Sequence, residues 1–187
     1  MKSLVIIPSR LNSTRLPEKP LILIKGKSLV SRVYHQVKKC KNKTDILIAT
    51  DNEKIVDHVK SFNGEVVLTN EKHISGTERC NEAVQSLNKT YDLIINVQGD
   101  EPIINPKIID EIINTFDDIN DEIITVAKEI NNPIEIDNAH IVKVEFNSEM
   151  IAKDFFRNPK NKNENSFYKH YGIYAFKPSI LKDVCNL

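Results

Sequence analysis

Short apolar runs alternate with amphipathic helical patterns along the first 120 residues of this chain. Four runs have the composition of buried strands, at residues 4–7, 45–50, 65–69 and 92–97. Apolar stripes with helical spacing follow them, at residues 29–37, 55–62, 80–87 and 108–116. Such alternation predicts right-handed βαβ units. We therefore expect an α/β fold, a Rossmann-like, mainly parallel sheet with helices on both faces.

The pattern changes beyond residue 120. Residues 123–127, 141–146 and 172–176 suit strands with little helix between them, which predicts a mixed extension of the sheet in the C-terminal part. The polar, Asn-rich residues 158–166 are expected to form a mobile loop and not a domain linker. We predict a single domain over residues 1–187, with a βα part (1–120) and a mixed part (121–187).

Composition excludes several classes of protein. Lys plus Arg and Asp plus Glu both total 26, so the formal net charge is zero and no overall field favours nucleic acid or an anionic membrane. The three cysteines lack C-x-x-C spacing, which argues against a disulfide framework and a structural zinc site. No apolar run is long enough for a signal peptide or a membrane span. We expect a cytoplasmic protein with no nucleic-acid partner and no membrane insertion.

Two adjacent acids, Asp100 and Glu101, follow the strand at residues 92–97. The carboxyl ends of parallel strands form the ligand-binding edge of an open α/β sheet. A carboxylate there is a candidate Mg²⁺ ligand, especially if the substrate carries phosphates. The alternative is an ordinary solvated turn, in which acids and Gly are common.

The loop after the first strand carries Arg10, Arg15 and Lys19 among three prolines within residues 8–20. Three cations in a proline-stiffened loop suit a triphosphate, because Arg grips oxygens in pairs and Lys supplies a point charge. A basic surface loop is the alternative. The chain has neither G-x-x-x-x-G-K-[ST] nor G-x-G-x-x-G, so side chains more than glycine amides would hold the phosphates.

Four motifs resemble, in order, those of 3-deoxy-manno-octulosonate (Kdo) cytidylyltransferases, the CMP-Kdo synthetases. They are I-P-S-R-L-N-S-T-R-L-P-E-K-P-L (7–21), A-T-D (49–51), H-I-S-G-T-E-R (73–79) and V-Q-G-D-E-P (97–102). The resemblance extends from Leu4 to about Phe176. It implies the nucleotide-diphospho-sugar transferase type of fold, with CTP bound by residues 1–120 and with sugar binding and homodimer contacts in residues 121–187.

The resemblance implies that CTP and Kdo react to CMP-Kdo and pyrophosphate, with Mg²⁺ as cofactor, for lipopolysaccharide biosynthesis. Catalytic roles fall on Arg10, Lys19 and Asp100, with Asp100 also the metal ligand. CTP-binding roles fall on Arg10, Ser13, Arg15, Lys19, Ala49, Thr50, Asp51, His73, Ser75, Gly76, Thr77 and Arg79. Kdo-binding roles fall on Gln98, Arg157, His170 and Tyr174. On residue type alone, Tyr174 could equally be core, His170 a satisfied half-buried histidine and Arg157 a surface charge.

Three departures from the family pattern bear on these roles. Glu18 stands where the family usually has Gly, and we expect its side chain to point outward. Phe156 replaces the usual Ser before Arg157. The family's C-terminal motifs, which supply a second metal-binding carboxylate, are absent, so we expect the chain to lack that segment. The alternatives are a cytidylyltransferase for another acidic sugar, such as a sialic acid, and a catalytically inert CTP-binding fragment.

Overall fold

The computed structural model describes residues 1–12, 16–118, 122–159 and 167–186, and its contacts divide the chain into two units. The first comprises Met1–Ile124 and Tyr174–Leu187, and the second comprises Thr125–Ile173. Two strands, at residues 123–129 and 168–176, each begin in one unit and end in the other. The predicted boundary at residue 120 lies near the first division, whereas residues 174–187 return to the first unit. Whether the chain forms one domain stays a prediction.

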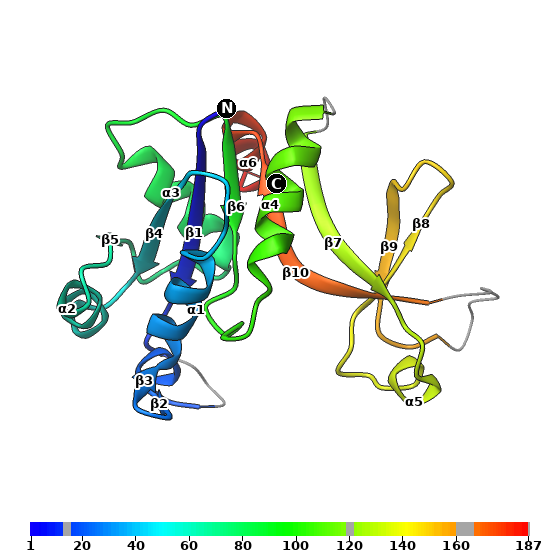
Figure 1. Ribbon diagram of the computed structural model, residues 1–187, viewed down its shortest axis with the longest axis horizontal. Coiled ribbons are helices and arrows are strands. Elements are labelled where there is room, and N and C mark those ends of the chain that lie inside the picture. Colours follow the sequence, from blue (N-terminus) through cyan, green and yellow to red (C-terminus); the bar gives the residue numbers. More distant parts are fainter. Residues whose placement is uncertain (13–15, 119–121, 160–166, 187) are drawn as a thin grey trace. The chain divides into compact units, whose positions relative to one another are not determined.

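The sheet of the first unit has four parallel strands in the order β5 (Val66–Leu68), β4 (Thr44–Thr50), β1 (Ser3–Ser9) and β6 (Leu93–Asn96) (Figure 1). The end of β10 (Tyr168–Phe176) pairs antiparallel with β6. Strands β1 and β6 are buried almost throughout, as expected of central strands covered on both faces. The predicted α/β class with a mainly parallel sheet is confirmed.

Helices cover both faces of this sheet. They are α1 (Leu29–Val37), α2 (Glu53–Ser61), α3 (Gly76–Gln85), α4 (Pro106–Asp118) and α6 (Pro178–Val184). One core cluster packs apolar residues of α3 and α6 against β1, β4 and β6. The side chains of Ser28, Asn52 and Ser75 accept backbone N–H groups at the starts of α1, α2 and α3, which fixes where these helices begin.

The second unit contains most of β7 (Ile123–Glu129), all of β8 (Lys143–Phe146) and β9 (Ala152–Phe156), and the first part of β10. β8 pairs antiparallel with β9 and with β10, and β7 pairs with β10. A short helix, α5 (Pro133–Ile136), follows β7. The antiparallel pairings of β8 belong to the same sheet as the parallel strands, so the predicted mixed extension of the sheet is confirmed.

Several local expectations were wrong or incomplete. Strand β1 continues through Pro8 to Ser9, where we expected the loop to begin at Pro8. Its pairing with β6 ends at Ile6, so the missing N–H of Pro8 costs no bond on that side. The sequence did not predict β9, the turn η1 (Lys19–Leu21) or the hairpin of β2 (Leu23–Ile24) and β3 (Lys27–Ser28). Most of the loop expected at 158–166 lies outside the described residues.

Among the helices that the structure describes, none is both long and apolar enough to cross a membrane.

Candidate nucleotide-binding site

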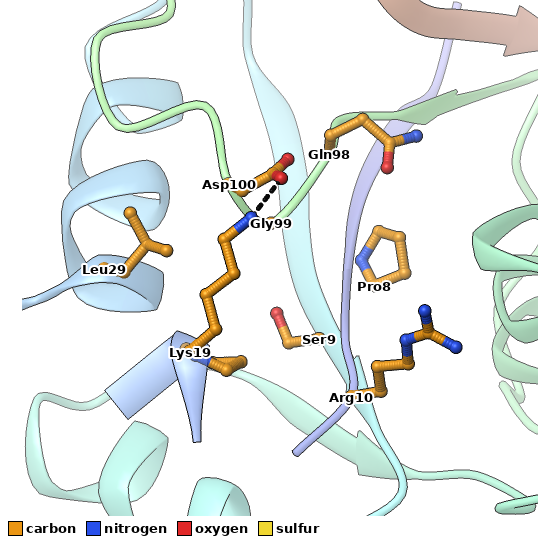
Figure 2. A pocket seen from close by; sticks show the side chains of 9 residues that line it. Pro8, Ser9, Arg10, Lys19, Leu29, Gln98, Gly99 and Asp100 are labelled. Carbon is orange, nitrogen blue, oxygen red and sulfur yellow. Dashed lines mark hydrogen bonds and ion pairs between the residues drawn. The ribbon is translucent and has the colours of Figure 1, made fainter. Parts of the chain in front are cut away.

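A cavity of about 180 Å³ lies at the carboxyl ends of β1 and β6, within the first unit. It brings together two loops that lie far apart in the sequence. Its lining residues are Pro8, Ser9, Arg10, Lys19, Pro20, Leu29, Gln98, Gly99 and Asp100. Figure 2 shows the Lys19 and Asp100 side chains on the Leu29 side of the cavity, with Arg10 and Gln98 on the Pro8 side. All three residues predicted to be catalytic therefore line one cavity.

Lys19 and Asp100 form an ion pair in this cavity. Lys19 Nζ donates to Asp100 Oδ2 at 2.5 Å, and the two side chains are 32% and 49% exposed. Such solvent-exposed pairs contribute little to the stability of a fold. Both groups can consequently exchange partners with a ligand at small cost.

Gly99 sets the depth of the cavity. A Cβ atom placed on this residue would lie 2.6 Å from the carbonyl oxygen of Pro8 and 2.9 Å from Ser9 Oγ. Any side chain at this position would push the loop that carries Asp100 away from the end of β1. Glycine is therefore required for the close approach of the two strand ends.

Glu18 precedes the turn η1, which positions Lys19. Its backbone is left-handed, with a φ of 50°, a conformation that favours glycine. This geometry suits the Gly that the resemblance to the family leads us to expect at this place. The Glu18 carboxylate accepts a hydrogen bond from Lys54 Nζ at 2.9 Å and is half exposed, so the expectation that it points outward is confirmed.

A second cavity, of about 170 Å³, shares Pro8, Arg10 and Gln98 with the first. Its other lining residues come from the loop before α3 and from its first turns: His73, Ile74, Ser75, Gly76 and Arg79. Backbone N–H groups at a helix start carry partial positive charge. This cavity therefore offers both cationic and hydrogen-bonding groups beside the first one.

Ser75 and Glu78 form a reciprocal cap at the start of α3. Ser75 Oγ accepts from the Glu78 N–H at 3.1 Å, and the Glu78 carboxylate accepts from the Ile74 N–H at 3.1 Å. The bond from Ile74, aided by Ser75 and His73, keeps the pKa of Glu78 below its ordinary value. The His73 ring lies between Glu78 and Glu82 and bonds to Glu82 through Nε2. These contacts hold the loop that lines the second cavity.

A buried ion pair braces three loops around the site. Arg79 Nη2 donates to Asp51 Oδ2 at 2.9 Å, and the two side chains are only 3% and 12% exposed. Arg79 Nη1 donates to Thr69 Oγ1 at 2.6 Å, and Asp51 Oδ1 accepts the Leu11 N–H at 3.1 Å. Losing one partner would leave a buried charge unpaired, which is strongly destabilising. The pair thus holds the loop after β1 to the start of α3.

Not every predicted CTP-binding residue lines these cavities. Ala49 and Thr50 are fully buried within β4, Asp51 is held in the ion pair with Arg79, and Thr77 is half-buried on α3; none of these four lines either cavity. Ser13 and Arg15 lie outside the described residues. The predicted roles of these six residues stay predictions, as do the roles of the residues that line the cavities.

The four predicted sugar-binding residues fall in both units. Gln98 lines both cavities of the first unit. Tyr174, also in the first unit, packs against the core and stacks on Phe176 with ring centroids 6.0 Å apart, and burial raises its pKa.

The other two belong to the second unit. His170 Nε2 lies 2.8 Å from Thr125 Oγ1, and burial lowers the pKa of the imidazole. The Arg157 side chain is exposed and donates to two backbone carbonyls. The sequence left core or surface roles open for Tyr174, His170 and Arg157, and these contacts are compatible with those roles too.

Asp100 suits a magnesium ion that arrives with a nucleotide. Mg²⁺ is usually held by one or two carboxylates together with substrate phosphates and water, not by a cage of protein ligands. Among the described residues, no group of three or more His, Cys, Asp and Glu side chains could hold a metal. Asp100 is a single half-exposed carboxylate beside two cationic side chains. It therefore fits a metal that is held jointly with substrate phosphates, and it does not fit a cage of protein ligands.

Sequence reasoning missed several lining residues, namely Pro8, Ser9, Pro20, Leu29, Ile74 and Gly99. Leu29 is an ordinary residue of a helical stripe, and nothing in the sequence marks it as part of a cavity. Gly99 carried a usable signal, since a glycine between a buried strand and two acids indicates a close backbone approach.

An α/β sheet with cations, a carboxylate and a helix start at the carboxyl ends of its strands is typical of nucleotide-binding proteins. The sequence profile of the cytidylyltransferase family matches residues 4–187. The chain belongs to this family, as its four motifs implied.

Similar proteins cover the whole chain. The 3-deoxy-manno-octulosonate cytidylyltransferase of Parabacteroides distasonis is 39% identical over an alignment of 201 positions, which covers all of this chain and 79% of that protein. The 8-amino-3,8-dideoxy-manno-octulosonate cytidylyltransferase of Shewanella sp. (strain W3-18-1) is 40% identical over an alignment of 194 positions, which again covers all of this chain and 79% of that protein.

Solved structures agree with this membership. A CMP:2-keto-3-deoxy-manno-octonic acid synthetase complexed with CTP superimposes with a TM-score of 0.92 and 31% identity, over all of this chain and 78% of that one. A cytidylyltransferase from Leptospira borgpetersenii, with a TM-score of 0.65 and 19% identity over all of this chain and 65% of that one, shares the fold. The expected nucleotidyltransferase class is confirmed.

Proposed function

We propose that this enzyme transfers the cytidylyl group of CTP to Kdo, giving CMP-Kdo and pyrophosphate. The observation that carries the proposal is the pair of adjoining cavities that share Arg10 and Gln98. The first offers Lys19, Arg10 and Asp100 to a triphosphate, and the second offers the start of α3 to a nucleoside. The similarity to Kdo cytidylyltransferases over the full chain supports the choice of sugar.

The reaction asks the protein chiefly for in-line positioning and for neutralisation of charge. The anomeric hydroxyl oxygen of the sugar attacks the α-phosphorus, the bond to pyrophosphate breaks and the hydroxyl proton is released. In this proposal Arg10 and Lys19 bind the triphosphate oxygens and stabilise the charge that develops on the departing pyrophosphate. Residues 73–79 surround the cytidine, and Asp51 and Arg79 hold that loop in place.

Asp100 would hold Mg²⁺, which supplies charge neutralisation on the phosphate oxygens when bound. In the structure Lys19 forms an ion pair with that carboxylate. We propose that CTP draws Lys19 onto its phosphates and so frees Asp100 for the metal. Arg10 and Lys19 would then both lie along the triphosphate, which carries a larger negative charge than the Asp100 carboxylate.

On the sugar side, we assign Gln98 and Tyr174 to hydroxyl groups and Arg157 to the carboxylate of Kdo. A guanidinium binds a carboxylate through two parallel hydrogen bonds, which suits an acidic sugar. We assign His170 a hydrogen-bonding role as a neutral imidazole, since its burial disfavours the charged form.

We also propose a homodimer with contacts in the mixed C-terminal part, and a role in lipopolysaccharide synthesis in the cytoplasm. Large apolar side chains of the second unit are exposed, with Ile134 at 79% and Met150 at 71%. These side chains are available for apolar contacts with a second copy of the chain.

A pyrophosphate-release assay with CTP and Mg²⁺ tests the activity. Kdo, its 8-amino-8-deoxy analogue and a sialic acid should be compared, with UTP and ATP as nucleotide controls. We expect turnover with CTP and Kdo and little with the other nucleotides. Turnover with a sialic acid alone would overturn the choice of Kdo.

A second candidate substrate is 8-amino-3,8-dideoxy-manno-octulosonate. The observation that favours it is the 40% identity to the Shewanella enzyme, which is as high as that to the Kdo enzymes. The two sugars differ at one carbon, where an ammonium group replaces a hydroxyl. A lower KM for the amino sugar in the same assay would favour this candidate.

A further inference from the structure

Lys143 is a fully buried lysine in strand β8 of the second unit, outside the site described above. Burying an ammonium group is costly unless it is paired or hydrogen-bonded, and a fully buried lysine is rare. Its Nζ donates to the carbonyl oxygens of Asn138 at 2.8 Å and Arg157 at 2.9 Å. The lysine therefore holds two backbone segments together by charge-assisted hydrogen bonds.

The turn that Lys143 reaches also holds the side chain of Arg157. Arg157 Nη1 donates to the carbonyl oxygens of Ala139 and His140, at 3.2 Å each. Three successive carbonyl groups, from Asn138 to His140, thus accept from two cations. Arg157 is held at its backbone by Lys143 and at its side chain by the same turn.

The Arg157 guanidinium retains one unused edge among the residues that the structure describes. All its hydrogen bonds there come from Nη1, and the side chain is exposed. Nε and Nη2 form the edge that can bind a carboxylate through two parallel bonds. Burial is the main cause that lowers the pKa of Lys143; the Asp137 carboxylate opposes this shift, and repulsion by the Arg157 charge adds to it.

We infer that Lys143 is a positioning residue for the acidic sugar: it fixes the Arg157 backbone and the 138–140 turn so that the free guanidinium edge is presented to the sugar carboxylate. The inference rests on the proposed function, since it assigns Arg157 to that carboxylate. An apolar side chain at position 143 would leave the Asn138 and Arg157 carbonyls without this donor. The guanidinium would then sample orientations that bind the carboxylate poorly.

The test compares Lys143→Met and Lys143→Arg with the wild type in pyrophosphate release by the full chain. Lys153→Met, at an exposed position of the neighbouring strand β9, is the matched control. For Lys143→Met we expect the KM for Kdo to rise about tenfold or more, with the KM for CTP within about twofold. Lys143→Arg should restore part of the affinity for Kdo, and Lys153→Met should behave as the wild type.

Hydrogen exchange at residues 156–158 gives a second measurement that does not need activity. Lys143→Met should accelerate exchange there, and Lys153→Met should not. If Lys143→Met lowers Tm but leaves the KM for Kdo unchanged well below that Tm, Lys143 is only a structural brace and the inference is wrong. Unchanged exchange at residues 156–158 would overturn it as well.

The wild type separates this inference from the proposed function. If wild-type enzyme turns over another acidic sugar but not Kdo, the choice of Kdo fails, and the same KM comparison with that sugar still tests Lys143. If no acidic sugar is turned over, the proposed function fails and the sugar role of Lys143 fails with it. Accelerated exchange in Lys143→Met would then show a brace without a sugar role.

Discussion

Asp100 carries the most direct prediction at the scale of residues. Asp100→Asn should weaken Mg²⁺-dependent binding of CTP by about tenfold or more, roughly 1.4 kcal/mol, because an amide is a poor ligand for this hard cation. The half-exposed ion pair with Lys19 stabilises the fold by at most about 1 kcal/mol, so the variant should fold normally. Calorimetric titration of CTP with and without Mg²⁺ measures the effect.

Asp57→Asn is the control for this prediction, because Asp57 lies exposed on α2 and lines neither cavity. It should bind CTP as the wild type does. Asp110 on α4 is a less suitable control, because its carboxylate accepts the N–H groups of Lys41 and Asn42. Its replacement would disturb the backbone at residues 41–42. If Asp100→Asn and Asp57→Asn gave the same Mg²⁺ dependence, Asp100 would not be the metal ligand.

Gly99 carries a second prediction at this scale. Gly99→Ala places a Cβ 2.6 Å from the Pro8 carbonyl oxygen, so the loop that holds Asp100 must move. We expect a loss of about 1–3 kcal/mol in the free energy of unfolding, typical of overpacking, together with CTP binding at least about tenfold weaker. Urea denaturation and the same titration measure the two effects. Wild-type values in both would show that the strand ends can separate without cost.

At the scale of elements, the stability of the start of α3 should depend on pH. The pKa of Glu78 lies below its ordinary value of 4.5 in the folded chain, chiefly because its carboxylate accepts the Ile74 N–H. A carboxylate with a lowered pKa contributes stability that is present above its unfolded pKa and is lost as the pH falls through the folded pKa.

We therefore expect Glu78→Gln to unfold at lower urea concentration than the wild type at pH 7. This difference should shrink as the pH falls below 4.5, where the wild-type carboxylate becomes protonated. Urea midpoints of the wild type and of Glu78→Gln, measured between pH 7 and pH 3, give this difference. Glu111→Gln, on an exposed position of α4, controls for the loss of one exposed carboxylate. If the difference stayed constant down to pH 3, the ionised Glu78 carboxylate would not be what stabilises the start of α3.

At the scale of the whole molecule, the proposed homodimer is the property to test. Light scattering should give a mass near twice the 21.4 kDa of the chain. Met150→Glu places a charge at an apolar position that is 71% exposed, and it should shift the equilibrium toward the monomer if this surface forms the interface. A monomeric wild type at micromolar concentration would contradict the proposal.

Much of the fold was predictable because its signals are local. The four parallel strands and the helices α1 to α4 follow from apolar spacing and from capping residues such as Ser28 and Asn52, which act within a few residues of their own position. Strand β9 was missed because four of its five residues are exposed, so no apolar pattern marks it. The loop cations and Asp100 were identified as candidates, whereas their contacts were not.

Sequence alone thus determined the α/β class, the alternation of the four parallel strands with their helices and the family, since these depend on short-range patterns and on motifs. Tertiary structure decided that Lys19 meets Asp100 across 81 positions of sequence, and that Asp51 and Arg79 brace the loops. It also decided that Lys143 is buried against the Arg157 carbonyl. Such contacts depend on how separate elements pack, and no local pattern encodes the distance between two side chains that the fold brings together.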